Sequence, residues 1–160
     1  MPFQPIQSDD IPEAHPVRAY LRHFEGHKTS AGVLSGQEFD PLQVASLLPW
    51  LLILDVVPRY DPPVYRYRFA GPKCCELFGI DYTGKLLGDD LPVEAAERRR
   101  QEFHEVVEGH VPVFARANVP LPGKEHKEIY RGVFPLAKRD SDIIDQLHVV
   151  IAPISETTET

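Results

Sequence analysis

The stretch from Tyr65 to Pro92, YRYRFAGPKCCELFGIDYTGKLLGDDLP, constrains the fold more than any other part of this chain. It begins with an alternating strand and continues into a two-turn helix that Gly79 closes. Two polar turns follow and lead into a longer helix. The pattern therefore predicts that two short helical pieces, the first of them closed by Gly79, lie between a pair of strands and this longer helix. The turn residues are Asp81, Thr83, Gly84, Gly88 and Asp89. Few folds place these elements so close together.

The size and charge of the chain limit the possible classes of protein. With 160 residues, of which 42% are apolar and 26% charged, the sequence is that of one globular domain. The formal net charge of −7 disfavours binding to nucleic acid, which requires a basic surface, and to anionic membranes. The one basic run, Arg98–Arg100, lies among glutamates at helical spacing, so we expect a solvated helix face with ion pairs.

The cysteines and the N-terminus predict a cytoplasmic location. Cys74 and Cys75 are adjacent and would form only a strained disulfide, which favours a reducing compartment. The first residues have neither the basic start nor the apolar run of a signal peptide. The longest apolar run, residues 47–57, is about half as long as a membrane span and is interrupted by Pro49 and Asp55. We therefore expect no membrane partner.

The region before the core domain contains one amphipathic helix. This helix starts at Pro16 and carries apolar residues at helical spacing, namely Val17, Tyr20, Leu21 and Phe24. Burying these side chains contributes roughly 1.5–3 kcal/mol each, so the stripe must be covered by the chain's own sheet or by a second subunit. We expect a homodimer with these four residues in a two-fold interface.

The remaining elements predict an α+β domain with a five-stranded antiparallel sheet. Asp40 and Pro41 open a short helix as N-cap and first helical residue. Strands and helices do not alternate one by one, which is typical of antiparallel sheets. The expected strands are Leu51 to Val57, Val64 to Ala70, Val111 to Val119, Glu128 to Leu136 and Ile144 to Ala152, with a helix over Val93 to Glu108. The expected division is a flexible segment 1–14, a helical extension 15–48, a core 49–154 and a disordered tail 155–160.

This order of elements and several short motifs resemble the PAS fold, and more closely the PAS_5 family of small alphaproteobacterial proteins. LLPWLLILDVV is similar to the first strand of that family, YRYRFAG to the second, and ELFGIDYTGKLL to its central segment. IYRGVFPLAKRDSDIID resembles its late strand–turn–strand signature. One departure is Gly71-Pro72, where the family usually has Gly-Thr, and a second is RDSD, where a glycine commonly follows the aspartate. Together the motifs cover about residues 16–153.

The resemblance implies a stand-alone sensor or adaptor domain for signalling. Its ligand would be a small organic molecule in a cavity between the sheet and the central helices, or its partner another protein. Periodicity turns Tyr67, Phe78, Phe103 and Val107 inward, so these residues are expected to line an apolar pocket with few polar groups. The alternative is a protein-interaction module whose core is filled and which binds no ligand.

Two polar residues near the expected pocket are further candidates. Arg68 lies inside the second strand, where its guanidinium could pair with Glu76 or bind an anion. Cys75 could serve as a redox-sensing thiol, although a packed, inert cysteine is the simpler interpretation.

No cofactor, metal or enzymatic activity is expected. The polar residues that surround a flavin in photosensory PAS domains are missing around the cysteines. A haem would need an inward histidine on the long helix, and His104 is expected at the surface beside the inward Phe103. The chain also lacks a nucleophile elbow and a phosphate-binding loop, so we expect no catalysis.

Overall fold

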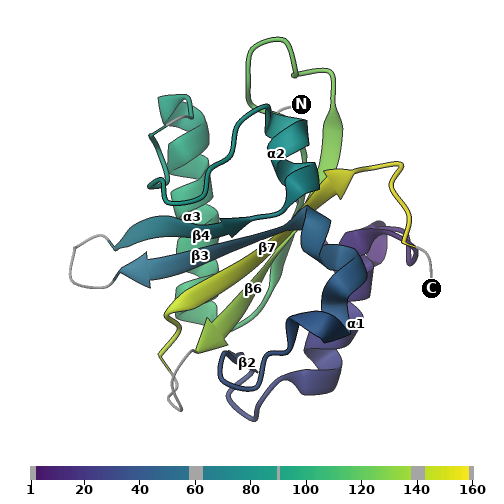
Figure 1. The fold of residues 1–160 in the computed structure, drawn as a ribbon, viewed down its shortest axis with the longest axis vertical. Coiled ribbons are helices and arrows are strands. Elements are labelled where there is room, and N and C mark those ends of the chain that lie inside the picture. The colour runs from purple at the N-terminus through teal and green to yellow at the C-terminus, as the bar shows by residue number, and fades with distance from the viewer. Residues whose placement is uncertain (1–2, 58–62, 90, 138–142, 159–160) are drawn as a thin grey trace.

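One antiparallel sheet organises the molecule, as the computed structural model shows (Figure 1). The structure describes residues 3–57, 63–89, 91–137 and 143–158. Within these residues the strand order is β1-β5-β6-β7-β3-β4, and the two-residue β2 pairs in parallel with β6. The strands are β1 (Phe3–Ile6), β2 (Leu34–Ser35), β3 (Leu51–Val57), β4 (Val64–Ala70), β5 (Val113–Asn118), β6 (Glu128–Ala137) and β7 (Gln146–Pro153). The five predicted strands are thus confirmed as one antiparallel sheet, with β1 and β2 added.

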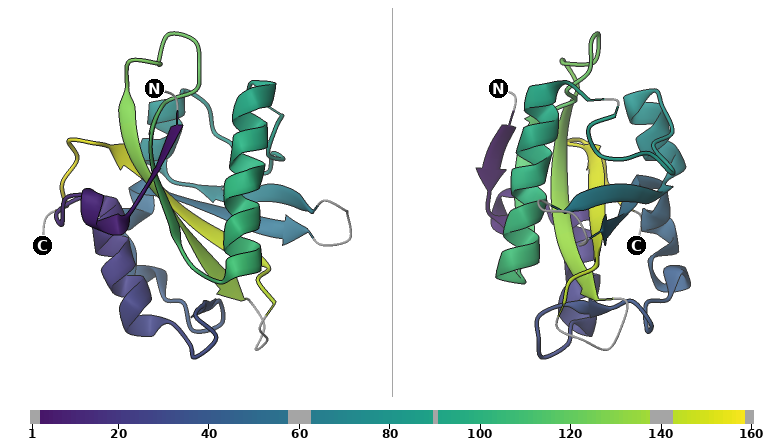
Figure 2. Two further views of the ribbon diagram at one scale, coloured as in Figure 1. Left: turned by 180° about the vertical axis from the view of Figure 1, so that it is seen from behind. Right: turned by 90° about the vertical axis from the view of Figure 1, so that its left-hand side faces the viewer.

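Helices cover both faces of this sheet. Figure 2 shows α3 crossing one face, with η2 on the opposite side. The helical elements are η1 (Ser8–Asp10), α1 (Pro16–His27), η2 (Pro41–Trp50), α2 (Pro72–Phe78) and α3 (Val93–Gly109). As predicted, Asp40 caps η2 by accepting a hydrogen bond from the Leu42 amide at 3.0 Å, and Gly79 ends α2 in a left-handed conformation with φ 77°. No described helix has the length and apolar character needed to cross a membrane.

The first face of the sheet forms the larger part of the core. Alternation along β3 places Leu52, Leu54 and Val56 on this face, where they pack with the buried side chains of α2 and α3. Tyr65 and Tyr67 of β4 lie on it as well. Strict alternation along β4 would place Phe69 on the same face as these tyrosines, but Phe69 packs on the opposite one. The reason is a register shift between Ile53 and Leu54, which makes Arg68 an extra residue on β4 and reverses the alternation there.

The second face is covered by α1 and η2 of the same chain. Val17, Tyr20 and Phe24 are completely or almost completely buried in an aromatic cluster that includes Phe134, and Leu21 is half-buried at its edge. These three side chains therefore lie in the core of their own subunit and are not available as the predicted dimer interface. The apolar stripe was correctly identified, but its own sheet leaves a face open for it, and intramolecular burial requires no second chain.

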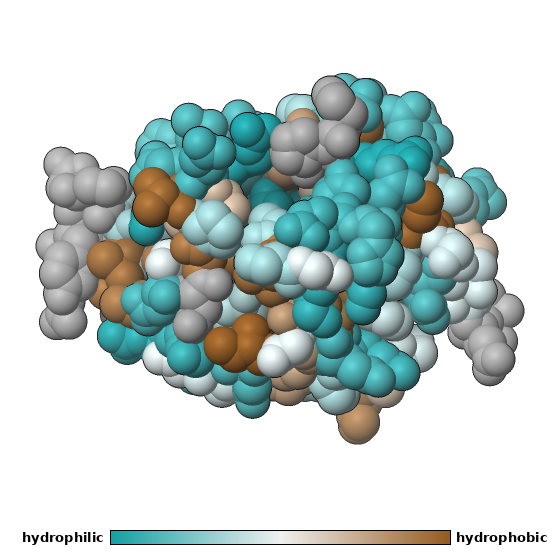
Figure 3. All heavy atoms as spheres, turned by 90° about the horizontal axis from the view of Figure 1, so that it is seen from above, coloured by the Kyte–Doolittle hydropathy of each residue, from teal (hydrophilic) through white to brown (hydrophobic). Residues whose placement is uncertain are grey.

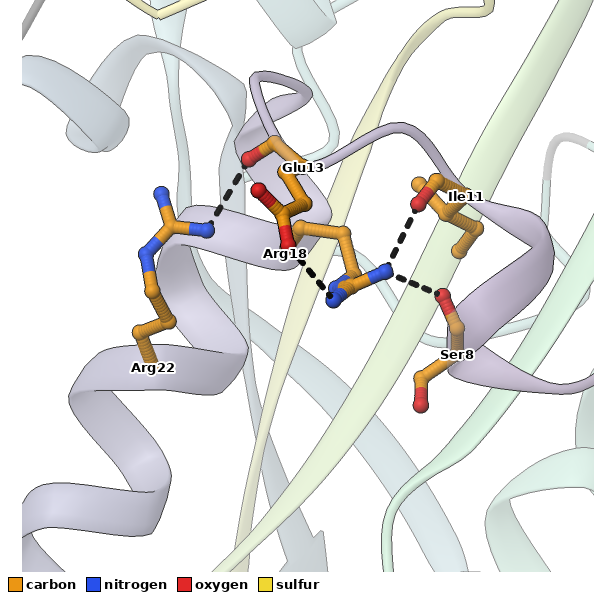
Figure 4. A network of polar contacts seen from close by, with 5 residues as sticks. All are labelled: Ser8, Ile11, Glu13, Arg18 and Arg22. Carbon is orange, nitrogen blue, oxygen red and sulfur yellow. Dashed lines mark hydrogen bonds and ion pairs between the residues drawn. The ribbon is translucent and has the colours of Figure 1, made fainter.

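From Phe3 on, the N-terminal segment is an ordered part of this fold, in contrast to the flexible segment predicted for residues 1–14, of which residues 1–2 lie outside the described residues. β1 pairs antiparallel with β5, and Ile11 is buried. Arg18 on α1 donates hydrogen bonds to the carbonyls of Ser8 at 3.1 Å and Ile11 at 2.9 Å (Figure 4). Arg22 reaches the Glu13 carbonyl at 2.9 Å. The prediction was based on the many proline and acidic residues of this segment. It was wrong because the backbone groups of the segment form hydrogen bonds with β5 and α1, which the local composition does not reveal.

The C-terminal residues are also anchored where they are described. The Thr158 amide donates a hydrogen bond to the Ala14 carbonyl at 2.7 Å, so residues 155–158 lie beside the N-terminal segment. The predicted disordered tail also includes residues 159–160, which lie outside the described residues.

The segment between α2 and α3 contains turns and one bridge instead of the predicted second short helix. The Gly84 amide donates to the Tyr67 carbonyl at 2.7 Å, and the Leu87 amide donates to the Tyr65 carbonyl at 2.9 Å. Residues 84–87 therefore run along the free edge of β4, with Leu86 opposite Arg66. Pairing with a strand edge satisfies these backbone groups as well as a helix would, and local sequence does not reveal it.

Candidate functional site

A small cavity lies between the first face of the sheet, α2 and α3. Its volume is about 20 Å³, which is enough for one water-sized occupant. Two of its lining residues, Leu91 and Pro120, are half-buried, whereas most of the others are buried. The lining residues are Leu52, Tyr67, Phe78, Tyr82, Leu91, Arg99, Phe103, Pro120, Ile129, Arg131 and Ile151.

The structure brings three of the six predicted pocket residues together. Tyr67, Phe78 and Phe103 line the cavity, each from a different element. Val107 is half-buried against the same core but does not line the cavity. Periodicity correctly placed it on the inner side of α3, and its position one turn beyond Phe103 takes it past the cavity.

The other two predicted residues lie away from the cavity. Arg68 is exposed and pairs with Asp55 on the adjacent strand, Nε to Oδ2 at 2.9 Å. The predicted partner Glu76 instead contacts Lys73 at 3.5 Å. Cys75 is half-buried, and its Sγ lies 3.7 Å from the Ala70 carbonyl oxygen. Arg68 therefore joins two strands and does not pin the short helices to the sheet.

A buried ion pair connects α3 to the sheet beside the cavity. Alternation along β6 turns Arg131 towards α3, where Glu102 faces it. Arg131 Nε lies 2.9 Å from Oε2 and its Nη2 lies 2.5 Å from Oε1, so both carboxylate oxygens are bound. Only 3% of Arg131 and 5% of Glu102 are exposed. This two-oxygen geometry compensates the cost of burying both charges.

Arg99 is the second guanidinium at the cavity, one helical turn before Glu102 on the same face of α3. It is 6% exposed, and its Nη1 is buried without a hydrogen-bond partner among the described residues. The guanidinium carbon lies 5.1 Å from the centre of the Phe3 ring on β1. Burial, and next the charge of Arg131, lower the pKa of Arg99 to about 9, so the group remains charged at neutral pH.

The cavity is therefore more polar than the sequence predicted. The Arg98–Arg100 run was expected to form a solvated helix face. This is correct for Arg98, which is exposed, and for Arg100, which forms an ion pair with Glu97 at 3.0 Å. It is wrong for Arg99, because a 100° step per residue turns the middle arginine inward. The signal that could have identified it is its spacing of four residues from Phe103, the residue already expected to face the core.

Aromatic hydroxyl groups add to the polar character of the cavity. Tyr67 and Tyr82 stack with ring centres 5.1 Å apart, and Phe78 contacts the Tyr82 ring edge-on at 5.6 Å. Burial raises the pKa of Tyr67, which keeps its hydroxyl protonated at neutral pH. A protonated hydroxyl can donate a hydrogen bond to an occupant of the cavity.

The cysteines are free thiols in surroundings that disfavour the thiolate. Burial raises the pKa of Cys74 to about 12. The pKa of Cys75 is also raised, by partial desolvation and by the nearby Asp81 carboxylate. Since the thiolate is the reactive form, this environment gives no support to a redox-sensing role at either position.

The second face of the sheet holds a separate buried polar pair. The Tyr20 hydroxyl forms a short hydrogen bond with Nδ1 of His148, which is fully buried with no partner for its Nε2 among the described residues. Phe39 contacts the His148 ring edge-on at 4.7 Å. Burial, and next the proximity of His23, lower the pKa of His148 to about 3, so this imidazole is neutral in the folded protein.

Acidification should therefore destabilise the protein through His148. In the unfolded chain the residue binds a proton below its ordinary pKa of 6.5, whereas in the folded protein it stays neutral down to about pH 3. The unfolded state thus gains protons as the pH falls through this window, and the contribution of His148 to stability is lost. From pH 7.5 to 5 we expect a loss of about 2 kcal/mol in the free energy of unfolding.

Urea unfolding of the wild type and of a His148→Gln variant at both pH values measures this contribution. The variant should lose about 2 kcal/mol less than the wild type between the two pH values, because the carboxylates and the other histidines are common to both. Equal losses in the two proteins would show that His148 is protonated in the folded state.

His23 and His27 stack on the outer side of α1 with ring centres 4.3 Å apart. Their separation of four residues is a spacing that two metal ligands on one helix can have. Within the described part of the chain, however, no three histidine, cysteine or acidic side chains gather closely enough to hold a metal ion. His104 is exposed, as expected.

Comparison with known proteins agrees with the fold and the order of its elements. The PAS_5 family, described as a PAS domain, matches residues 13–147. Its range includes α1, four of the five predicted strands, the first two residues of β7, and the helices that enclose the cavity. The chain has the architecture of a PAS domain. It belongs to the PAS_5 family.

Two solved structures are similar to this chain. A domain of an HTR-like protein from Haloarcula marismortui has 16% identity and a TM-score of 0.48, over 67% of this chain and 99% of that one. A sensory box histidine kinase/response regulator from Burkholderia thailandensis has 10% identity and a TM-score of 0.44, over 72% and 86% of the two chains. The search of curated proteins gives no match.

Proposed function

We propose that this PAS domain is a signalling sensor that binds a small ligand in the cavity between the sheet, α2 and α3. The observation that carries the proposal concerns Arg99, which lines the cavity and whose buried Nη1 has no hydrogen-bond partner among the described residues. An unsatisfied charged donor in the core is costly, and such groups in native proteins commonly mark a binding site.

The surroundings of the cavity favour a sensor over a filled interaction module. The cavity combines apolar walls with two guanidinium groups and two tyrosines, which is the composition of a small-molecule site. The exposed large apolar residues Leu42, Val93, Val111 and Ile143 belong to separate parts of the chain. On the end of the molecule in Figure 3, the coloured surface is mostly hydrophilic, with apolar residues in small scattered groups. That end offers little support for a broad apolar docking site.

The contacts of the cavity wall indicate how binding of an occupant could change the position of α3. α3 carries Arg99, Glu102 and Phe103, and Glu102 ties it to β6. Residues 84–87 form hydrogen bonds with the edge of β4 and connect α2 to α3 in the sequence. An occupant that bonds Arg99 would shift α3 relative to β6 and bias these contacts.

The proposal is tested by amide chemical-shift mapping of the isotopically labelled protein against a library of ions and molecules of one or two heavy atoms. Saturable shifts should centre on residues of the cavity wall, with Tyr67, Arg99 and Phe103 among the most affected. Native mass spectrometry of the purified protein should show a retained small species. A protein whose cavity resonances respond to no compound would contradict the proposal and favour an interaction module.

Homodimerisation stays a prediction. A dimer would have to use other residues than Val17, Tyr20 and Phe24, since these are buried within one chain. Light scattering at high micromolar concentration measures the oligomeric state. A cytoplasmic location and the absence of catalysis likewise remain expectations of the sequence.

A further inference from the structure

The charges buried around the cavity do not balance. Arg99 and Arg131 are two buried cations, and Glu102 is the buried anion beside them. Both oxygens of Glu102 are bound by Arg131, at 2.9 Å from Nε and 2.5 Å from Nη2. The next charged neighbour of Arg99 is Arg98, which adds further positive charge. Among the described residues, one positive charge therefore remains uncompensated in a low-dielectric environment.

The geometry of Arg99 leaves one side of its guanidinium free to bind an occupant. The guanidinium lies over the Phe3 ring, and this cation–π contact provides part of its stabilisation. Its buried Nη1 has no hydrogen-bond partner in the described structure. The neighbouring Tyr67 is protonated at neutral pH and brings no negative charge that would repel an anion.

The size of the cavity limits what this occupant can be. About 20 Å³ holds a water molecule or a species only slightly larger. Water would satisfy the hydrogen bond of Nη1 but would leave the charge uncompensated. A divalent or bulky anion would not fit, whereas one negative charge of water-like size satisfies the volume, the donor and the charge together.

We infer that the cavity binds a small monovalent anion, such as chloride, through Nη1 of Arg99. This inference rests on the proposed ligand-binding function and names the ligand class of the same site. It also explains why two guanidinium groups can be buried beside a single carboxylate, since the anion supplies the second negative charge.

Thermal unfolding with chloride as the probe tests this inference. Formate, which carries the same charge on three heavy atoms and exceeds the size of the cavity, serves as the control. The buffer contains potassium gluconate at constant ionic strength, because gluconate is too bulky to enter the cavity. Near one hundred times its dissociation constant, chloride should raise the wild-type melting temperature by about 5–10 °C, with saturation. Formate should cause little change, because it has the same charge but is too large for the cavity.

Two matched variants assign the effect to the cavity. Arg99→Gln should abolish the rise, while Arg98→Gln, which removes the exposed cation over the same Phe3 ring, should retain it. If Arg99→Gln does not fold, chloride titration of the labelled wild type decides instead, and the shifts should centre on Arg99, Phe103 and Ile129.

The possible failures are distinguishable. If formate stabilises as strongly as chloride, or if only neutral compounds shift the cavity resonances, the inference of a small anion in the cavity is wrong and the proposed sensor function stands. A chloride effect that persists in Arg99→Gln, or shifts remote from the cavity, places the anion elsewhere and overturns the inference. A wild type that responds to no anion overturns it as well, and the library screen then decides the sensor function separately.

Discussion

Replacing Glu102 with glutamine should lower the free energy of unfolding by about 3–5 kcal/mol, the largest effect expected of any single substitution considered for this protein. Glu102 is 5% exposed, and its two oxygens hold Arg131. Glutamine keeps the size of the side chain but removes the charge, so Arg131 and Arg99 would remain buried without a neighbouring anion. Urea denaturation at neutral pH measures the loss.

Two further variants separate the ion pair from general effects on α3. Glu105→Gln removes an exposed carboxylate of the same helix and should change stability by less than about 0.5 kcal/mol. The double variant Glu102→Leu with Arg131→Met should recover most of the loss, because neither charge is then buried. An effect of Glu102→Gln no larger than that of Glu105→Gln would mean that the pair is hydrated in solution.

Gly71→Ala should cost about 3 kcal/mol or more, because there is no space for a methyl group at this position. A Cβ on Gly71 would lie 2.2 Å from the Leu48 carbonyl oxygen and 2.5 Å from that of Pro49. Both contacts are with backbone at the end of η2, and the Gly71 amide also donates to the Leu51 carbonyl at 2.8 Å. Relief would require η2 to move away from the junction of β4 and α2.

Gly109→Ala is the matched control for this prediction. Gly109 ends α3, and a Cβ there would meet only the Val111 side chain at an ordinary distance of 3.5 Å. The substitution should be neutral or stabilise the protein by up to about 1 kcal/mol, since alanine is the better helix former. Melting temperatures of the two variants compare them directly, and similar values would show that the backbone around Gly71 adapts at little cost.

Locally encoded elements were predicted well. The β4 strand and the end of α2 at Gly79 match the structure because alternation and a left-handed glycine are properties of adjacent residues. The N-cap of η2 at Asp40 was also predicted correctly, because it too depends on neighbouring residues. The prediction of a second short helix was wrong, since residues 84–87 form hydrogen bonds with the edge of β4. The glycines and polar residues there permit either structure locally.

The candidate site was predicted only in its apolar part. Periodicity turned Tyr67, Phe78 and Phe103 towards a common interior, where the structure places them. It missed Arg99, because an arginine between two others reads as part of a charged face until its exact rotation on α3 is known. It missed the pair of Glu102 with Arg131 because 29 residues separate the partners in sequence.

The sequence alone determined the five main strands, the longer helices and most of their apolar positions, since these properties depend on residues within a few positions of one another. Only the tertiary structure decided which apolar face meets which. It placed Val17 and Phe24 on their own sheet, and it buried Arg99 at the cavity with a charge that the described chain leaves uncompensated. The physical reason is that burial and charge compensation depend on groups that folding brings together from distant positions, and a single sequence contains no local record of those distances.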